Sequence, residues 1–321
     1  MMVKFTAKKV ISKSLLLSAV LGCTLSAAVN AQDGPPGTDI FIADLSKNPL
    51  GFWATQNFEA VTTRKGYDNQ PYFLPDGSGL LYTAMLKTDN GQWQADSFEY
   101  NFDSKKHTNL TNSPLSEYSP TLMAGGYYIS SIVVEADNKQ HLWGLPFHSK
   151  AKAYRLSNLE PVGYHVWGKK GAIAMFVLGS EKLPNDKSTL QFQQSFKTKP
   201  KVVANDIGRS LRFIPERNAF SFSQLKQDKK WWLSEYDPKT DSVTALVPLP
   251  KGSDYYTWID DKTAVTAVGN ELRLWTYNDN DKSASIADWM PWVDASKVCK
   301  TKVTRLAVDR DKSKLAIVCD E

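Results

Sequence analysis

The chain has 321 residues, 42% of them hydrophobic, with 39 Lys and Arg against 34 Asp and Glu. This length is enough to bury a large core and allows one β domain of this size. No basic stripe with interleaved aromatic residues appears, which argues against a nucleic-acid partner.

The first 31 residues are typical of a secretory signal peptide. Lysines at positions 4 to 13 precede an apolar run rich in small residues over 15–29, and Ala31 suits a cleavage site. We therefore predict a signal peptide at residues 1–31, a mature domain at residues 32–321 and a periplasmic location, with secretion as the alternative. The signal holds four of the lysines, so the mature chain has 35 basic against 34 acidic residues, a net charge of +1.

Two other interpretations of this N-terminal segment stay open. An uncleaved membrane anchor is one, although the apolar run is short and rich in Ser and Ala. The other is a lipoprotein, because Val20-Leu21-Gly22-Cys23 resembles a bacterial lipoprotein cleavage box, in which Cys23 would carry lipid. No other apolar run is long enough to cross a membrane.

A hairpin pattern recurs along the rest of the chain. Its first copy, PYFLPDGSGLLYTA, places two apolar runs on either side of a Pro-Asp-Gly-Ser-Gly turn. Six such hairpins begin at residues 71, 120, 166, 211, 256 and 305. Their spacing of 45 to 49 residues indicates an internal repeat.

A second pair of strands is predicted between consecutive hairpins. The first strand of each pair is TDIFIADL, DSFEYNF, QHLWGLPF, STLQFQQSF, KWWLSEYD or NELRLWTY, from Thr38 onward. The short polar strands that follow are EAVTTR, KHTNLT, AYRLS, PKVVAN, SVTALV and SASIAD. Each repeat therefore contains four strands, and helical periodicity is nearly absent.

Four-stranded units of this length, repeated radially, predict an all-β fold, a six-bladed β-propeller. A β-sandwich is the alternative, but it does not produce four-strand modules at constant spacing. The chain starts with an outer pair of strands and ends with an inner hairpin. We expect the N-terminal strands to complete the last blade and close the ring, which removes open sheet edges.

Two cysteines remain after the signal, Cys299 and Cys319. In an oxidising compartment such a pair predicts a disulfide, and two buried thiols are the alternative. Two thiols without a nearby His supply too few ligands for a metal site.

The repeats resemble those of a known family. YDNQPYFLPDGSGLLYTA resembles the P-x-F-S-P-D-G-x-x-I-x-F unit of TolB-like propellers, and DIFIADL with FEAVTT resembles the strands that alternate with it. The match is clear in two repeats and fades from about Val166 onward. It implies a six-bladed propeller without the α/β domain that precedes the propeller in TolB.

No motif for chemistry accompanies the repeats. G-x-S-x-G, the nucleophile elbow of hydrolases, is absent. The four histidines, His107, His141, His148 and His165, show no metal-ligand spacing. NDNDKS, at residues 278–283, lacks the Gly and the Glu of a calcium loop and favours a turn. We therefore predict no catalytic residue, no cofactor and no metal.

One aromatic segment, DWMPWVDASKVCK, falls between the last outer strand and the final hairpin and is predicted to be a loop. Trp289, Met290, Pro291 and Trp292 are our candidates for a partner-binding anchor, since Trp is enriched in interface hot spots. The alternative is a loop packed on the core of the ring.

The resemblance implies an exported binding or scaffold module that presents propeller loops to a protein or peptide of the cell envelope. A propeller enzyme, a hydrolase or lyase acting on an envelope polymer or glycan, is the alternative. It would use acids and histidines that converge at the mouth of a central tunnel. A small-ligand or glycan binder that uses the aromatic loops is a third possibility.

Overall fold

The computed structural model describes residues 36–179, 187–214, 216–253, 255–278 and 285–321. The predicted signal peptide, Cys23 and residues 279–283 of the NDNDKS segment lie outside these residues. In the described part of the chain, no helix has the length and apolar character that a membrane span needs.

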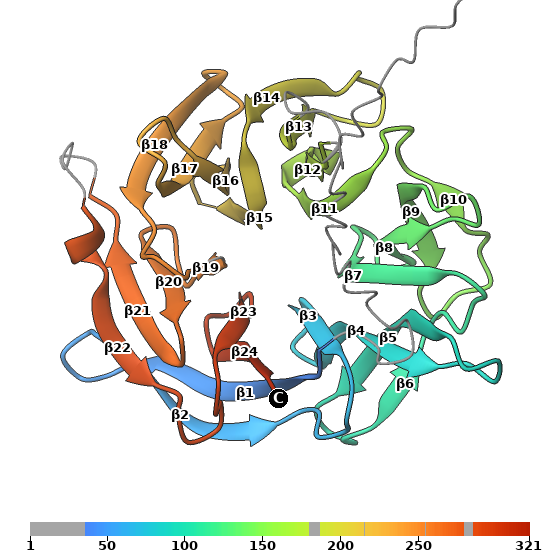
Figure 1. The fold of residues 1–321 in the computed structure, drawn as a ribbon, viewed down its shortest axis with the longest axis horizontal. Helices are drawn as coiled ribbons and strands as arrows, with labels where there is room; N and C mark the ends of the chain where they lie inside the picture. Colours follow the sequence, from blue (N-terminus) through green and yellow to red (C-terminus); the bar gives the residue numbers. More distant parts are fainter. Residues whose placement is uncertain (1–35, 180–186, 215, 254, 279–284) are drawn as a thin grey trace, which may run out of the picture. The chain divides into compact units, whose positions relative to one another are not determined.

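Six antiparallel sheets of four strands each form a ring, which confirms the predicted six-bladed β-propeller (Figure 1). We number the blades along the chain and give the strands of each from the ring axis outward. Blade 1 is β3 (Asp68–Phe73), β4 (Gly79–Lys87), β5 (Trp93–Asn101) and β6 (His107–Asn109). Blade 2 is β7 (Ser116–Leu122), β8 (Tyr128–Val134), β9 (Gln140–Pro146) and β10 (Tyr154–Arg155).

The other four blades follow the same plan. Blade 3 is β11 (Val162–Trp167), β12 (Ile173–Val177), β13 (Thr189–Gln193) and β14 (Lys201–Asn205). Blade 4 is β15 (Ile207–Ile214), β16 (Ala219–Leu225), β17 (Trp231–Asp237) and β18 (Ser242–Pro248). Blade 5 is β19 (Tyr256–Trp258), β20 (Thr263–Val268), β21 (Glu271–Thr276) and β22 (Met290–Asp294). Blade 6 is β23 (Val303–Val308), β24 (Lys314–Asp320), β1 (Thr38–Lys47) and β2 (Trp53–Ala60). Two short 3₁₀ turns, η1 (Lys169–Gly171) and η2 (Ile286–Asp288), complete the described elements.

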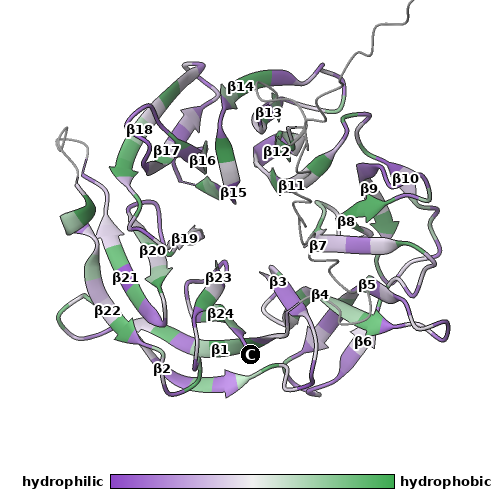
Figure 2. Cartoon of the chain, viewed as in Figure 1, coloured by the Kyte–Doolittle hydropathy of each residue, from purple (hydrophilic) through white to green (hydrophobic). Residues whose placement is uncertain are grey.

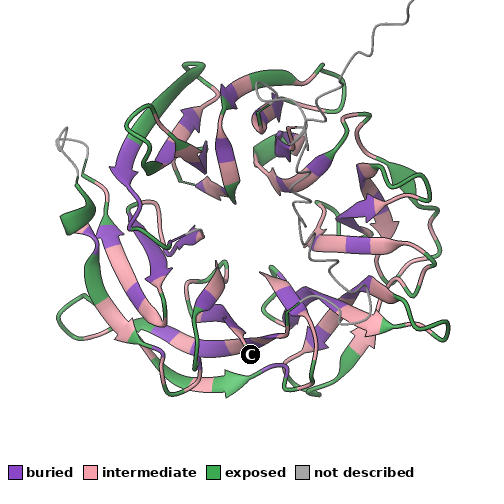
Figure 3. Ribbon diagram, viewed as in Figure 1, coloured by how far each residue is buried: buried purple, intermediate pink, exposed green. Residues whose placement is uncertain are grey.

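The hydrophobic core lies between neighbouring blades. Leu80 and Tyr82 of blade 1 pack with Ile40 and Val318 of blade 6, and every other pair of neighbouring blades shares a similar cluster. Hydrophobic and hydrophilic residues alternate along many strands (Figure 2), and the buried residues concentrate on the inner and middle strands (Figure 3). Because both faces of each sheet are covered by a neighbour, the ring is held together by six interfaces of this kind.

The Pro-Asp-Gly-Ser-Gly turn shows why the hairpin motif has its residues. Gly77 has a φ of 75°, a conformation that glycine adopts without strain. The Asp76 carboxylate accepts hydrogen bonds from the backbone N–H and the hydroxyl of Ser78. A Cβ atom on Gly79 would lie 2.1 Å from the carbonyl oxygen of Tyr100, so glycine permits the close approach of β4 to β5.

The two ends of the described chain meet in one sheet, as predicted. β1 pairs with β24 in antiparallel register from Thr38 opposite Asp320 to Asp44 opposite Lys314. The blade order is β2-β1-β24-β23, so the N-terminal strands complete the blade that the C-terminal hairpin begins. The start of β2 differs from the prediction: β2 begins at Trp53, before the EAVTTR segment. The Asn48 side chain accepts hydrogen bonds from the backbone N–H groups of Leu50 and Phe52 and so holds a turn that reverses the chain early.

The structure contains a disulfide between Cys299 and Cys319, whose Cα atoms lie 5.3 Å apart. Both residues are buried in the cluster between blades 5 and 6. The bond links β24 to the segment that leads into β23, and it closes a loop with a sequence separation of 20. A loop of this length corresponds to about 3 kcal/mol of stabilisation in the chain-entropy model.

We expect a chain lacking residues 38–64 to aggregate, because β24 would then present an unpaired edge. Size-exclusion chromatography of the truncated protein measures this. A synthetic peptide of residues 38–64, added during refolding, should pair with β24 and restore the monomer. A truncated chain that stays monomeric and melts like the full protein would show that closure is dispensable.

Candidate functional site

Large polar side chains from all six blades converge on the ring axis, at the end of the ring where the inner strands begin. We call this group the axial Arg–Tyr cluster. It consists of Tyr67, Tyr118, Tyr164, Arg209, Tyr255 and Arg305, one from each blade or from the residue just before its inner strand.

Arg305 joins opposite sides of the ring. Its Nη2 atom donates a hydrogen bond of 2.7 Å to the hydroxyl of Tyr164. Its guanidinium carbon lies 5.1 Å from the centroid of the Tyr164 ring and 4.2 Å from that of Tyr255. β23 and β11 belong to blades 6 and 3, which face each other across the axis (Figure 1). The hydrogen bond from Arg305 to Tyr164 therefore spans the axis.

Irregular strand register accompanies the cluster. The pairing of the inner strand shifts between Val162 and Tyr164 in β11, and between Val303 and Arg305 in β23. It shifts between Ile207 and Leu211 in β15, the interval that contains Arg209. Bulges of this kind redirect side chains. The bulges therefore accompany Tyr164, Arg209 and Arg305, and a shift between Tyr118 and Thr121 in β7 follows the same pattern. Tyr67 and Tyr255 lie just before their inner strands, outside the strand pairing.

The hydroxyl of Tyr164 accepts hydrogen bonds from Arg305 and from Tyr255. Burial raises the pKa of Tyr164, but the charge and hydrogen bond of Arg305 more than reverse this, so the pKa lies below its ordinary value of 10. Tyr255 also donates to Tyr164, and burial together with this bond raises the pKa of Tyr255 to about 12. Burial is also the main cause of the raised pKa of Tyr67. The neighbouring Tyr118, Tyr164 and Tyr255 raise this pKa further.

A half-buried arginine near the cluster, Arg212, bonds to three blades. Arg212 donates from Nη1 to the carbonyl of Leu211, from Nη2 to that of Leu306 and from Nε to the hydroxyl of Thr257. Burial lowers its pKa to about 10, and the charge of Arg305 contributes. With its guanidinium engaged in this way, Arg212 ties blades 4, 5 and 6 together.

Arg209 and Arg305 differ from Arg212 in having few partners. Arg209 is exposed, and it makes no hydrogen bond or ion pair with any residue in the described ranges. Arg305 donates to Tyr164 alone, and within those ranges no carboxylate pairs with it. The cluster is therefore a group of cations and hydroxyls without a counter-charge from the described part of the chain.

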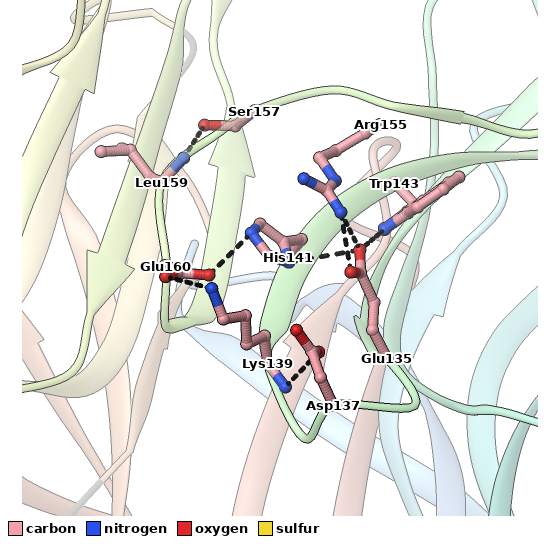
Figure 4. Close-up of polar contacts among 9 residues, drawn as sticks. All are labelled: Glu135, Asp137, Lys139, His141, Trp143, Arg155, Ser157, Leu159 and Glu160. Carbon is pink, nitrogen blue, oxygen red and sulfur yellow. Dashed lines mark hydrogen bonds and ion pairs between the residues drawn. The ribbon is translucent and has the colours of Figure 1, made fainter.

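A second polar group lies at the outer ends of blades 2 and 3 (Figure 4). The His141 ring lies between two carboxylates, 3.2 Å from Glu135 and 3.1 Å from Glu160. Arg155 donates to both oxygens of Glu135 at 2.7 Å, and Lys139 pairs with Glu160 at 2.9 Å. Each charge in this network already has a partner. The bonds of Glu160 to Lys139 and His141 hold the segment before β11 against blade 2.

A cavity of about 640 Å³ lies between blades 1 and 2. Its lining includes Glu117, whose side chain is 2% exposed and accepts a hydrogen bond from Ser113. The other carboxyl oxygen of Glu117 has no hydrogen-bond partner. Burial raises the pKa of Glu117 from 4.5 to about 7.

The predicted anchor segment is not a loop. Residues 290–294 form β22, the outermost strand of blade 5, while SASIAD, which we expected to be that strand, contains the cap and helix η2 in its described residues 285–288. Pro291 is compatible with a strand here because an edge strand tolerates proline.

Trp289 follows the alternative left open for this segment, since it packs on the core of the ring. Trp289 is 1% exposed, packs in the cluster between blades 4 and 5, and donates its indole N–H to the carbonyl of Pro248 at 2.9 Å. Trp292 is half-buried and donates to the carbonyl of Trp53 at 2.7 Å, which ties blade 5 to blade 6. Met290 and Pro291 are exposed. Partner binding by residues 289–292 stays a prediction.

The histidines lie apart from the cluster. His165 is buried and hydrogen-bonded to Ser130, and burial lowers its pKa to about 3. His107 contacts the Tyr82 hydroxyl, and His148 contacts Glu99.

Sequence reasoning missed the axial cluster, although a signal for it exists. A Tyr or an Arg stands at the first residue of each hairpin motif or within four residues before it. Tyr118, Tyr164 and Arg209 each stand two residues before their motif begins.

Comparison with known proteins supports the fold. No family model matches the sequence, and no curated protein matches it significantly. Among solved structures, TolB from Acinetobacter baumannii is similar with a TM-score of 0.57 and 12% identity, over 75% of this chain and 61% of that one. The fold is that of a TolB-like propeller.

Two further structures are similar to this TolB-like propeller. A protein from Agrobacterium tumefaciens described as a TolB candidate has a TM-score of 0.64 and 10% identity, over 90% of this chain and 99% of that one. The hydrazine synthase of Kuenenia stuttgartiensis has a TM-score of 0.51 and 11% identity, over 81% of this chain and 48% of that one. The chain thus spans about three fifths of the Acinetobacter protein and about half of the Kuenenia protein.

Trp289→Ala should lower the free energy of unfolding by about 3–5 kcal/mol, because it removes a fully buried indole. Met290→Ala, a change at the adjacent exposed residue, should alter it by less than about 0.5 kcal/mol. Chemical denaturation of both variants measures these differences. Equal stability of the two would contradict the burial of Trp289.

Glu117→Gln should change how stability depends on pH. The raised pKa of Glu117 means that the folded chain binds more protons than the unfolded chain between pH 4.5 and about 7, so its contribution to stability falls as pH rises through this window. At pH 8 the free energy of unfolding of the variant should exceed that of the wild type by about 3 kcal/mol, and at pH 4 the two should differ little. The control is Asp103→Asn, at an exposed carboxyl. Denaturation curves from pH 4 to pH 8 test this, and a constant difference between variant and wild type would contradict it.

Proposed function

We propose that this TolB-like propeller is an exported, non-catalytic binding module of the cell envelope. Its signal peptide directs it to the periplasm, where it presents one end of the ring to a protein or peptide partner. The predicted signal at residues 1–31 supports export, and the fold supports a binding role.

The observation that carries this proposal is the axial Arg–Tyr cluster. Arg209 is exposed at the end of the ring where the inner strands begin, and four tyrosines lie around the axis beside it. Arg and Tyr are the residue types that most often dominate binding energy at interfaces, together with Trp. Loops from six blades surround this point, so a partner can make contacts with several of them at once.

A lyase or hydrolase acting on an envelope glycan is the second candidate. Tyr164, with its lowered pKa and its bond to Arg305, has the features of a base held beside a cation. Turnover of a uronate-containing glycan, followed by the ultraviolet absorbance of the unsaturated product, would replace the binding proposal with this one.

Site-specific cross-linking tests the binding proposal. A photoreactive amino acid at position 65, an exposed lysine just before β3 at the same end of the ring, should cross-link a discrete envelope protein in living cells while Arg209 stays in place. The matched control places the same probe at Tyr127, an exposed residue in the turn between β7 and β8, at the other end of the ring. Products from position 65 alone are expected. Equal products from both positions, or none from position 65, would overturn the assignment of this end of the ring.

A further inference from the structure

We propose that the axial Arg–Tyr cluster is a binding site for a single oxyanion group, a carboxylate or a phosphate, carried by the ligand. This inference rests on the proposed binding function and names the chemistry that its ligand must contain. The site would take the group between Arg209 and Arg305, with tyrosine hydroxyls as additional donors.

The cluster gathers positive charge near the axis. The charge of Arg305 contributes to the lowered pKa of Arg212, and the charge of Arg209 acts on Tyr164 and Tyr255, so the three cations lie near one another. No carboxylate within the described ranges contributes to the electrostatics of Arg212 or Arg305. Positive charges gathered at a half-buried point attract anions more strongly than separate surface charges do, since the local dielectric constant is lower.

Several hydrogen-bond donors of the cluster are left unused among the described residues. Arg305 has five N–H donors, and the described residues accept from it at the Tyr164 hydroxyl alone. Tyr164 accepts from both Arg305 and Tyr255, so its own O–H is left to donate. The Tyr67 hydroxyl has no hydrogen-bond partner among the described side chains. The cluster therefore offers several donors and few acceptors, which is the complement of a carboxylate or phosphate.

The guanidinium group of Arg305 is fixed in position. Arg305 is held in place by stacking near two aromatic rings and by its bond to Tyr164. The backbone beside it, at Leu306, is in turn held by Arg212. A guanidinium fixed in this way loses little conformational entropy when it binds an anion, while exposed Arg209 can close over the group from the solvent side.

The other polar groups do not carry such an inference. In the network around His141, each cation is already paired with a carboxylate. Glu117 lines a cavity, but its partnerless oxygen is buried from solvent.

Titration of the mature protein with simple probes tests the proposal. The probes are N-acetyl-triglycine with a free carboxylate, the same peptide as its C-terminal amide, and inorganic phosphate, each followed by NMR shifts of the arginine side chains. The free acid or phosphate should bind saturably, and the amide should not. A response to the free acid assigns a carboxylate, and a response to phosphate alone assigns a phosphate.

Variants locate the site. Arg209→Gln should weaken binding of the responding probe at least tenfold, and Arg209→Lys should weaken it less, since charge is kept. Tyr164→Phe should weaken it as well, because it removes a donor. The matched control, Arg310→Gln, alters an exposed arginine in the turn between β23 and β24, at the other end of the ring, and should leave binding unchanged. Circular dichroism confirms that each variant is folded.

The outcomes separate this inference from the proposed function. Absence of saturable binding by every probe, or binding that Arg209→Gln and Tyr164→Phe leave intact, overturns the oxyanion site. If a partner still cross-links to position 65 in that case, the binding module stands and only the oxyanion chemistry fails. If oxyanions bind and no partner cross-links, the oxyanion site stands and the proposed partner fails.

Discussion

The pairing of β1 with β24 is the constraint on which the rest of the molecule depends. It joins residues from the two ends of the described chain in one sheet and so fixes the ring at six blades. The same strand also positions the first inner strand, because Thr38 donates from its backbone to Gly66 and from its hydroxyl to the carbonyl of Asp68. The segment that carries Tyr67 is thus held by the strand that closes the ring, and Arg305 lies on the hairpin to which this strand is added.

Closure by itself does not create a site, since a regular inner strand directs its side chains into the faces between blades. The register shifts in β11, β15 and β23 supply the difference. They redirect Tyr164, Arg209 and Arg305 while the rest of each strand keeps its apolar packing. Function and folding therefore use different parts of the same strands, with Leu211 and Leu306 in the core and Arg209 and Arg305 at the axis.

Sequence reasoning predicted the ring because its signal is repeated. Six hairpins, the glycine turn after Pro75 and the order of outer and inner strands together determine the blade number and the closure. It failed where a single local feature decides the structure. The place of residues 288–300 between SASIAD and the final hairpin suggested a loop, yet the anchoring of Trp289 by the carbonyl of Pro248 leads the chain into an edge strand. The axial cluster was missed because its members lie 45 to 51 residues apart, and because the bulges at Tyr164, Arg209 and Arg305 have no dependable sequence signature.

The physical cost of the axial cluster is an argument for its use. Cations that are drawn together and partly removed from water repel one another, and a half-buried arginine without a carboxylate loses hydration that a tyrosine hydroxyl replaces only in part. Arg212 recovers this loss through two carbonyls and a hydroxyl, so it is explained by the stability of the ring. Arg305 and Arg209 have no comparable set of acceptors in the described structure. A closed ring with six apolar interfaces can tolerate such a local cost. A bound oxyanion would offset it, so oxyanion binding should raise the free energy of unfolding of the ring.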